Sequence, residues 1–247
     1  MPKRYLLVVS TFLLSVLLYV DRAAIQAARE DITTKFQLSD IHFAWILAAF
    51  GFGYALMQTP SGRLADILGP RKVLTGVVIF WSIFTGMTGA AWNYVSLFIA
   101  RFLFGAGEAG AFPGMARAIY SWVPMKERGI VQGINFSGSR IGAALALPIV
   151  AVLISGFHCC SIDFDGIGWE NTFFLLMGIG FIWSVIWYAW FRDDPAEKNN
   201  ISPAELEFIK KNRQHSRPDV DVDDNADIPP LRLGNLVKSK NMWWLSI

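Results

Sequence analysis

Long apolar stretches without a charged residue dominate this chain. Three of them, Tyr5–Val20, Phe43–Met57 and Phe173–Phe191, contain no Asp, Glu, Lys or Arg. Hydrophobic types make up 53% of the 247 residues and charged types 17%, whereas soluble domains carry about 25% charged residues. This pattern excludes an ordinary soluble domain, a disordered chain and a nucleic-acid-binding protein, and it predicts an integral membrane protein whose surroundings are a lipid bilayer.

Six of the apolar segments are long enough to cross a membrane, because a hydrocarbon core of about 30 Å requires about 20 helical residues. Runs of this length and continuity favour helices over barrel strands. The fold class expected is therefore an all-α membrane protein, with a six-helix bundle over residues 1–192. The expected spans are 5–28, 41–60, 73–92, 95–121, 129–155 and 171–191. A seventh span is expected to start in 241–247.

The distribution of Lys and Arg predicts the orientation, since loops rich in these residues stay on the cytoplasmic side. With the N-terminus placed in the cytoplasm, sixteen of the 22 Lys and Arg residues lie in cytoplasmic segments. The outer loops hold only Arg29 and Lys35, and four arginines lie within or near the spans. Both ends of the six-span bundle are therefore expected on the cytoplasmic side.

Residues 193–240 differ from the rest and are predicted to form a central cytoplasmic loop. Ser202, Pro203 and Glu205 are typical of a helix start, which predicts a short amphipathic helix over 203–212. Asp219–Asp227 is an acidic linker without core-forming residues. We interpret the loop as a solvated connection between domains, with regulation or partner binding as the alternative.

The short loop between the second and third spans carries the most specific local pattern. It runs from Gly62 to Lys72 and combines two spaced glycines, one aspartate and two basic residues: Gly62, Asp66, Gly69, Arg71 and Lys72. Glycines allow a tight turn between helices, and the aspartate can accept from helix N-terminal amides or pair with an arginine. A generic cytoplasmic loop would explain the basic residues but not the glycines and the aspartate.

Ionisable residues within the spans are candidate functional residues, because a charge in hydrocarbon costs several kcal/mol unless it is paired or faces water. Asp21 and Arg22 lie in the first span. Arg101 and Glu108 lie seven residues apart in the fourth, so they share a helix face about 10 Å apart. Further polar candidates for the same cavity are Tyr19, Tyr54, Gln58, Asn135, Ser139 and Arg140. The alternative is that Asp21–Arg22 or Arg101–Glu108 is a structural ion pair.

Such a polar cavity suits the transport of an anion coupled to protons. Arginine binds a carboxylate through a planar, two-pronged contact, and a carboxyl group in a low-dielectric cavity can be neutral in one state and charged in another. An intramembrane enzyme is a weaker alternative. Ser137 resembles a membrane-protease serine only faintly, and none of the three histidines lies where it would act as its base. No cofactor and no metal site are expected.

Four segments together resemble the anion:cation symporter family within the major facilitator superfamily. They are the loop 62–72, the stretch from Arg101 to Pro113, the stretch from Trp122 to Arg128, and the region from Asp193 to Ile209. The resemblance implies twelve spans in two halves with the substrate between them, of which this chain holds the N-terminal half. It also implies a proton-coupled symporter of a sugar acid, such as a hexuronate, aldonate or aldarate, in the cell inner membrane.

The same resemblance implies roles for individual residues. Asp21 and Glu108 match the proton-handling carboxylates of the family, Arg22 and Arg101 its basic residues near the substrate, and Tyr19 and Tyr54 its substrate-contacting tyrosines.

Two features depart from the family pattern. Ser139-Arg140 stands where the galactonate carriers have a glutamine amide, and the outer loop with Cys159 and Cys160 is longer than usual. The alternatives are another superfamily transporter, such as a drug/proton antiporter or a uniporter, and a truncated half without function.

Overall fold

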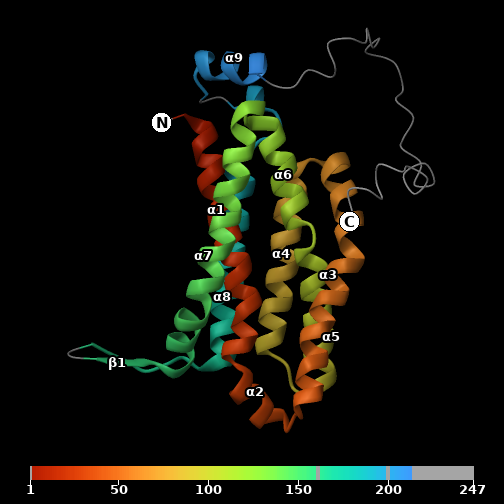
Figure 1. Ribbon diagram of the computed structural model, residues 1–247, viewed down its shortest axis with the longest axis vertical. Coiled ribbons are helices and arrows are strands. Elements are labelled where there is room, and N and C mark those ends of the chain that lie inside the picture. Colours follow the sequence, from red (N-terminus) through yellow and green to blue (C-terminus); the bar gives the residue numbers. More distant parts are fainter. Residues whose placement is uncertain (1, 160–161, 199–200, 213–247) are drawn as a thin grey trace. The chain divides into compact units, whose positions relative to one another are not determined.

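The computed structural model describes residues 2–159, 162–198 and 201–212 (Figure 1). The expected start of a seventh span at 241–247, the acidic linker Asp219–Asp227 and Cys160 lie outside the described residues. The described part of the chain is nearly all helical, as the apolar segments predicted.

Six helical segments in the described ranges are long and apolar enough to cross a membrane. They run beside one another as a bundle (Figure 1). Their bounds are α1 (Lys3–Ala27), α3 (Asp40–Leu68), α4 (Pro70–Gly89), the consecutive α5 (Tyr94–Glu108) and α6 (Ala111–Trp122), α7 (Arg128–Ser155) and α8 (Gly168–Trp190).

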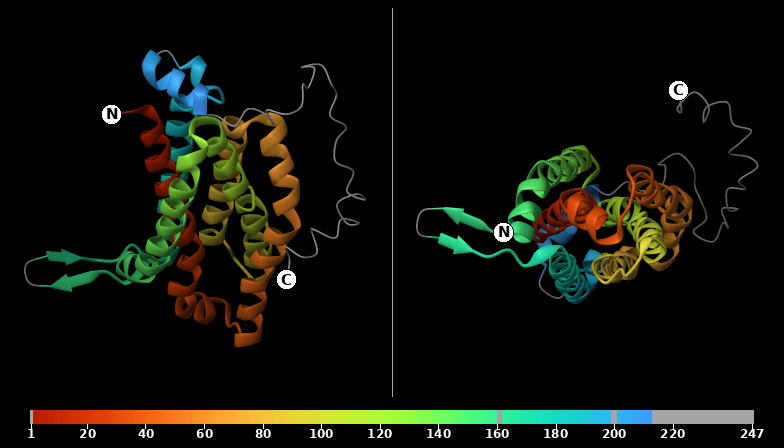
Figure 2. Two further views of the ribbon diagram at one scale, coloured as in Figure 1. Left: turned by 45° about the horizontal axis from the view of Figure 1, so that its top comes forward. Right: turned by 90° about the horizontal axis from the view of Figure 1, so that it is seen from below.

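Shorter elements lie at the two ends of the bundle. One end, here the α9 end, carries the start of α1, η1 (Met125–Glu127), η2 (Pro195–Glu197) and α9 (Pro203–Asn212). The opposite end, the α2 end, carries α2 (Arg29–Phe36) and an antiparallel hairpin of β1 (Phe157–Cys159) and β2 (Ile162–Phe164). The hairpin projects sideways from the bundle (Figure 2). Neither α2 nor the hairpin was expected from the sequence.

Local capping explains where several helices begin. Ser39 accepts a hydrogen bond from the backbone N–H of His42 at the start of α3. Asn93 and Ser96 form a reciprocal capping box at the start of α5, which satisfies amides that have no partner within the helix. Pro70 occupies the first turn of α4, where its missing N–H costs nothing.

Two expected spans differ from the observed helices. The second was expected to end at residue 60, but α3 continues to Leu68 and includes Pro60 in its interior. The fourth was expected as one span over 95–121, and Tyr94–Trp122 is one span, but its helix is interrupted at Ala109 and Gly110 between α5 and α6. Pro113 accounts for this interruption, because it has no N–H to donate to the carbonyl of Ala109.

The helices pack in pairs, with α1 against α7, α3 against α5, and α4 against both α8 and α5. Glycines allow the closest approach. A Cβ at Gly53 of α3 would collide with the carbonyl oxygen of Phe102 of α5, and a Cβ at Gly105 of α5 would collide with the carbonyl oxygen of Phe50 of α3. The two backbones are therefore in direct contact at two points.

The α9 helix is attached to the start of α1. The Glu205 carboxylate accepts hydrogen bonds from the backbone N–H groups of Lys3 and Arg4, each at 3.0 Å. Ile209 is the buried side chain of α9. The Arg4 guanidinium of α1 lies 4.8 Å from the ring centre of Phe208 of α9. A side chain of α9 thus caps the N-terminal turn of α1, where backbone N–H groups lack helical partners.

Candidate functional site

An ion pair between Arg22 of α1 and Glu108 of α5 forms the centre of the candidate site. The Arg22 Nε donates to Glu108 Oε1 at 2.5 Å. The Glu108 side chain is completely buried, whereas the Arg22 side chain is 22% exposed. The direct partner of Glu108 is therefore on another helix, and neither Asp21–Arg22 nor Arg101–Glu108 is among the ion pairs of the described residues.

Three aromatic rings surround the Arg22 guanidinium. Its central carbon lies 5.0 Å from the ring centre of Tyr19, 5.1 Å from that of Phe50 and 4.9 Å from that of Tyr54. The negative faces of aromatic rings attract a cation at these distances. Tyr19 and Tyr54 were predicted to belong to this site. Phe50 was missed, because an aromatic residue in an apolar span carries no signal that separates it from the core.

Arg101 of α5 lies next to the aromatic rings around Arg22 and is 2% exposed. Its guanidinium carbon lies 4.3 Å from the ring centre of Phe104 and 5.5 Å from that of Phe50, so Phe50 contacts both arginines. Arg101 is within electrostatic range of Glu108 and Asp21. Its Nε and Nη1 have no hydrogen-bond partner among the described residues. Guanidinium groups with unused donors are suited to bind an oxyanion.

Asp21 of α1 is 1% exposed and is the second buried carboxylate of the site. Its Oδ2 accepts a hydrogen bond of 3.1 Å from the indole Nε1 of Trp81 on α4, while Oδ1 has no partner within the described part of the chain. Asp21 also lies within electrostatic range of Glu108 and Arg101. The structure thus brings Asp21, Arg22, Arg101 and Glu108 together as one buried cluster, which we call the charge cluster.

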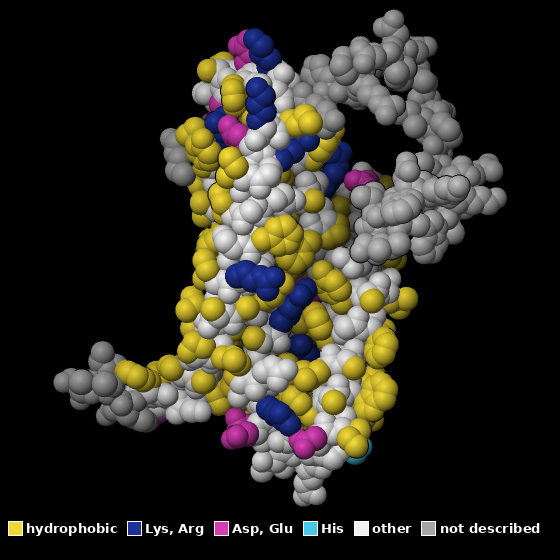
Figure 3. Space-filling model, viewed as in Figure 1, with side chains coloured by type: hydrophobic (Ala, Val, Ile, Leu, Met, Phe, Trp, Pro, Cys, Tyr) yellow, Lys and Arg dark blue, Asp and Glu magenta, His cyan; other side chains and the backbone are white. Residues whose placement is uncertain are grey.

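The remaining polar candidates lie elsewhere in the bundle. Asn135 and Ser139 of α7 are buried against α1, where Asn135 Oδ1 accepts a hydrogen bond of 3.0 Å from Thr11. Gln58 of α3 and Arg140 of α7 are exposed. None of these four has a described contact with the charge cluster. Figure 3 shows Lys and Arg side chains at mid-height of the bundle, between hydrophobic ones.

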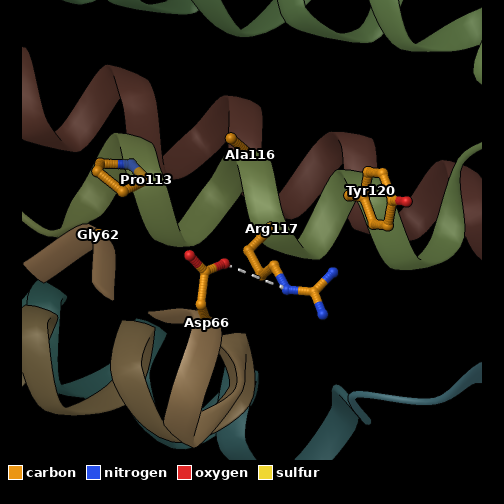
Figure 4. Close-up of a pocket in the computed structure, with 6 residues that line it drawn as sticks. All are labelled: Gly62, Asp66, Pro113, Ala116, Arg117 and Tyr120. Carbon is orange, nitrogen blue, oxygen red and sulfur yellow. Dashed lines mark ion pairs between the residues drawn. The ribbon is translucent and has the colours of Figure 1, made fainter. Parts of the chain in front are cut away.

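The loop motif lies at the α9 end, away from the charge cluster along the spans. Asp66 of α3 pairs with Arg117 of α6 across 3.6 Å. Both residues line an open pocket of about 420 Å³ together with Gly62, Pro113, Ala116 and Tyr120 (Figure 4). The sequence left two partners open for Asp66, helix N-terminal amides or an arginine, and the ion pair with Arg117 corresponds to the second. Nothing in the motif indicates which helix faces the aspartate.

Of the other motif residues, Gly69 forms the turn before α4 and Arg71 joins α4 to α8. Gly69 separates α3 from α4 and has a φ of +80°, in the region that favours glycine. The Asp193 carboxylate accepts a hydrogen bond of 2.8 Å from the backbone N–H of Arg71. In return, the Arg71 guanidinium donates to the carbonyl oxygen of Tyr188 at 3.0 and 2.8 Å. The N-terminus of α4 thus lies beside the negative charge of Asp193, and the C-terminus of α8 lies beside the positive charge of Arg71. Each charge is opposite to the partial charge of the helix dipole at that end. Lys72 is exposed.

No group of three or more His, Cys, Asp or Glu side chains that could hold a metal ion occurs among the residues that the structure describes.

Comparisons with known proteins identify the kind of protein to which this chain is similar. The probable galactarate/D-glucarate transporter GarP of Escherichia coli (strain K12) is 34% identical over 215 residues, which are 85% of this chain and 46% of GarP. The hexuronate transporter of Bacillus subtilis (strain 168) is 32% identical over 78% of this chain and 43% of the relative. The chain spans about half the length of the curated relatives that it matches.

A solved structure has the same arrangement of helices. It is the inward-facing, occupied crystal structure of a bacterial homologue of the human lysosomal transporter Spinster, with a TM-score of 0.70 at 26% identity. The match covers 79% of this chain and 46% of that one. These relatives are transporters and not enzymes. The family model of the Major Facilitator Superfamily matches residues 11–247, and the chain belongs to this superfamily.

Proposed function

We propose that this chain is the N-terminal half of a proton-coupled symporter that carries an organic anion of the sugar-acid class. The observation that carries this proposal is the Arg22–Glu108 pair, enclosed by aromatic rings and adjoined by Asp21 and Arg101. Membership of the superfamily already supports the coarser statement that this chain belongs to a transporter. The proposal adds the class of substrate and the coupling ion.

The two arginines supply the anion-binding groups. In the described residues, Arg22 Nη2 and two nitrogens of Arg101 are buried and have no hydrogen-bond partner. A substrate carboxylate would satisfy these donors in a two-pronged contact. The tyrosines beside Arg22 have hydroxyl groups suited to the hydroxyls of a sugar acid. Relatives named as galactarate/D-glucarate and hexuronate transporters are consistent with this substrate class.

The coupling to protons follows from the competition for Arg22. Glu108 holds Arg22 in the present structure. A proton on Glu108 removes the negative charge from this pair and leaves the Arg22 guanidinium free to bind the substrate anion. Loss of the proton restores the ion pair and expels the anion. Asp21, buried beside the same arginine cluster, is proposed as the second proton-binding carboxylate.

Transport would then proceed by alternating access, in which this bundle rocks against a C-terminal six-helix half. We place the α9 end on the cytoplasmic side of the cell inner membrane, because the Lys and Arg residues gather there. The motif residues Gly62, Asp66, Gly69, Arg71 and Lys72 are proposed to control the closure of that side. Gln58, Asn135, Ser139 and Arg140 are proposed to contribute to the substrate path from α3 and α7.

The test measures two activities of the gene product that carries this chain: proton-driven accumulation of substrate, and exchange of labelled for unlabelled substrate. Glu108→Gln and Asp21→Asn are assayed with radiolabelled glucarate, hexuronate and galactonate, and Glu207→Gln on the exposed face of α9 is the control. Both site variants are expected to lose proton-driven accumulation and keep exchange of labelled for unlabelled substrate, with the control unchanged. Accumulation that survives in both site variants would refute proton coupling through these carboxylates.

A further inference from the structure

We propose that Trp81 is the positioning residue for Asp21, and that its indole N–H keeps this carboxylate able to give up its proton during transport. The inference rests on the proposed function, since it assigns a residue to the proton-coupling step. Trp81 carries no ionisable group and belongs to α4, a helix that contributes none of the charges of the cluster.

The geometry of the contact is specific. Trp81 is 0% exposed and Asp21 1% exposed, and the indole Nε1 lies 3.1 Å from Asp21 Oδ2. An indole N–H donates and never accepts. Its bond is therefore stronger to an ionised carboxylate than to a neutral one. Within the described residues it is the one hydrogen bond that Asp21 receives through its side chain, because Oδ1 has no partner.

Packing from α5 holds the tryptophan in place. A Cβ at Gly107 would lie 3.1 Å from the backbone nitrogen of Trp81 and 2.5 Å from the Phe80 ring, so α4 and α5 approach closely at this point. Glu108 follows Gly107 directly in the chain. The backbone at Trp81 therefore packs directly beside the backbone that carries Glu108, and the hydrogen bond to Asp21 orients the indole.

Removal of the Trp81 indole N–H affects the ionised form of Asp21, which a loss of packing around Trp81 would not do. Both oxygens of a buried Asp21 would then lack a donor, so the ionised form would be left with a large desolvation cost. The protonated form would persist. A carrier in this state can still exchange substrate across the membrane, because exchange requires no release of the proton. It cannot accumulate substrate, because each cycle of accumulation ends with that release.

The chain offers two matched controls, since three tryptophans among the described residues are completely buried. Trp122 donates its N–H to the backbone carbonyl of Arg192 at 2.8 Å. Trp187 stacks between Trp183 and Phe191, and its N–H has no partner among the described residues. Trp122→Phe and Trp187→Phe therefore remove a buried indole, with and without a hydrogen bond, but touch no residue of the charge cluster.

The experiment measures accumulation and exchange for Trp81→Phe, Trp122→Phe, Trp187→Phe and Asp21→Asn in the gene product that carries this chain. Trp81→Phe is expected to lower accumulation by about tenfold or more, the size expected for losing a hydrogen bond to a charged group, while exchange stays within about twofold. The two controls are expected to keep the ratio of accumulation to exchange. Adding Trp81→Phe to Asp21→Asn is expected to cause no further change in the exchange activity, because Trp81 acts through Asp21.

Three results would overturn the assignment of Trp81: an unchanged ratio in Trp81→Phe, an equal fall of both activities, or a further loss of exchange in the double variant. If Asp21→Asn and Glu108→Gln both accumulate substrate, the proposed function fails together with the inference. If Glu108→Gln does not accumulate substrate but Asp21→Asn or Trp81→Phe does, the inference alone fails. Should Trp81→Phe not fold, replacement of Trp81 by a benzothienyl analogue, in which sulfur stands for the N–H, preserves the ring shape and decides the same question.

Discussion

Arg22 and Glu108 are 86 residues apart in the chain and 2.5 Å apart in the structure. Their pair joins α1 to α5 inside the bundle, where Glu108 has no exposed surface. A buried ion pair contributes little net stability when intact but leaves a costly charge when one partner is removed. Loss of one partner is therefore expected to destabilise the bundle more than loss of both.

The first prediction follows from this asymmetry. Arg22→Ala leaves Glu108 buried without its partner and is expected to lower the free energy of unfolding by about 3–5 kcal/mol. Arg22→Ala combined with Glu108→Gln removes both charges and is expected to recover part of the loss. Thermal or denaturant unfolding in mixed micelles measures both. Equal stability of the single and double variants would show that the charge of Glu108 is compensated in another way.

The second prediction concerns the contact between α3 and α5. Gly105→Ala and Gly53→Ala would each place a methyl group into a backbone carbonyl of the other helix, and overpacking of this kind costs about 1–3 kcal/mol. Gly51→Ala on the same helix is the control, since nothing lies within 4 Å of its Cβ position. Melting temperatures should fall for the first two variants and not for the third. A similar fall in all three would indicate a loss of helix flexibility instead of a steric clash.

The third prediction concerns the turn between α3 and α4. Gly69→Ala combines a φ of +80° with a Cβ only 2.6 Å from the Asp193 carboxylate, and backbone strain alone costs about 1–3 kcal/mol. Gly62→Ala is the matched control within the same motif, because its nearest neighbour, Cβ of Pro113, is at 3.7 Å. Gly69→Ala should therefore reduce stability and Gly62→Ala should not, as measured by unfolding. The reverse order would mean that the pocket at Gly62 is closed in the folded protein.

The fourth prediction concerns α9. Glu205→Ala removes the acceptor for two backbone N–H groups of α1, and loss of such a cap costs about 1 kcal/mol. Hydrogen exchange should speed up in α9 and in the first turn of α1. Glu207→Ala changes an exposed glutamate of the same helix and should leave both segments as protected as before. Unchanged protection in Glu205→Ala would show that the burial of Ile209 and the contact between Arg4 and Phe208 are enough to attach α9.

Much of the fold could be predicted from hydropathy, because the bilayer imposes a length and a polarity on each span. Helix α9 lies at Pro203–Asn212, the residues at which the cap pattern placed it. The break between α5 and α6 and the extension of α3 past Pro60 could not be predicted in the same way. A proline inside an apolar run interrupts a helix or bends it according to the neighbours that satisfy the freed carbonyl.

The candidate site could be predicted in part for a similar reason. Asp21, Arg22, Arg101 and Glu108 stand out because charges are rare in apolar spans, and the structure brings all four together. Which charge pairs with which could not be predicted, because it depends on the rotation of α1 against α5. Phe50 and Trp81 had no signal at all, since their place in the site follows only from the charged side chains that they contact.

The reciprocal glycine contacts between α3 and α5 also determine which part of the site is free to shift. These helices cannot slide past each other without a backbone collision, so Phe50, Arg101 and Glu108 travel as one unit. Arg22 and Asp21 belong to α1, which packs against α7 through Gly138 and Gly142. A movement of the backbones that separates Arg22 from Glu108 would therefore displace the α1–α7 pair relative to the α3–α5 pair.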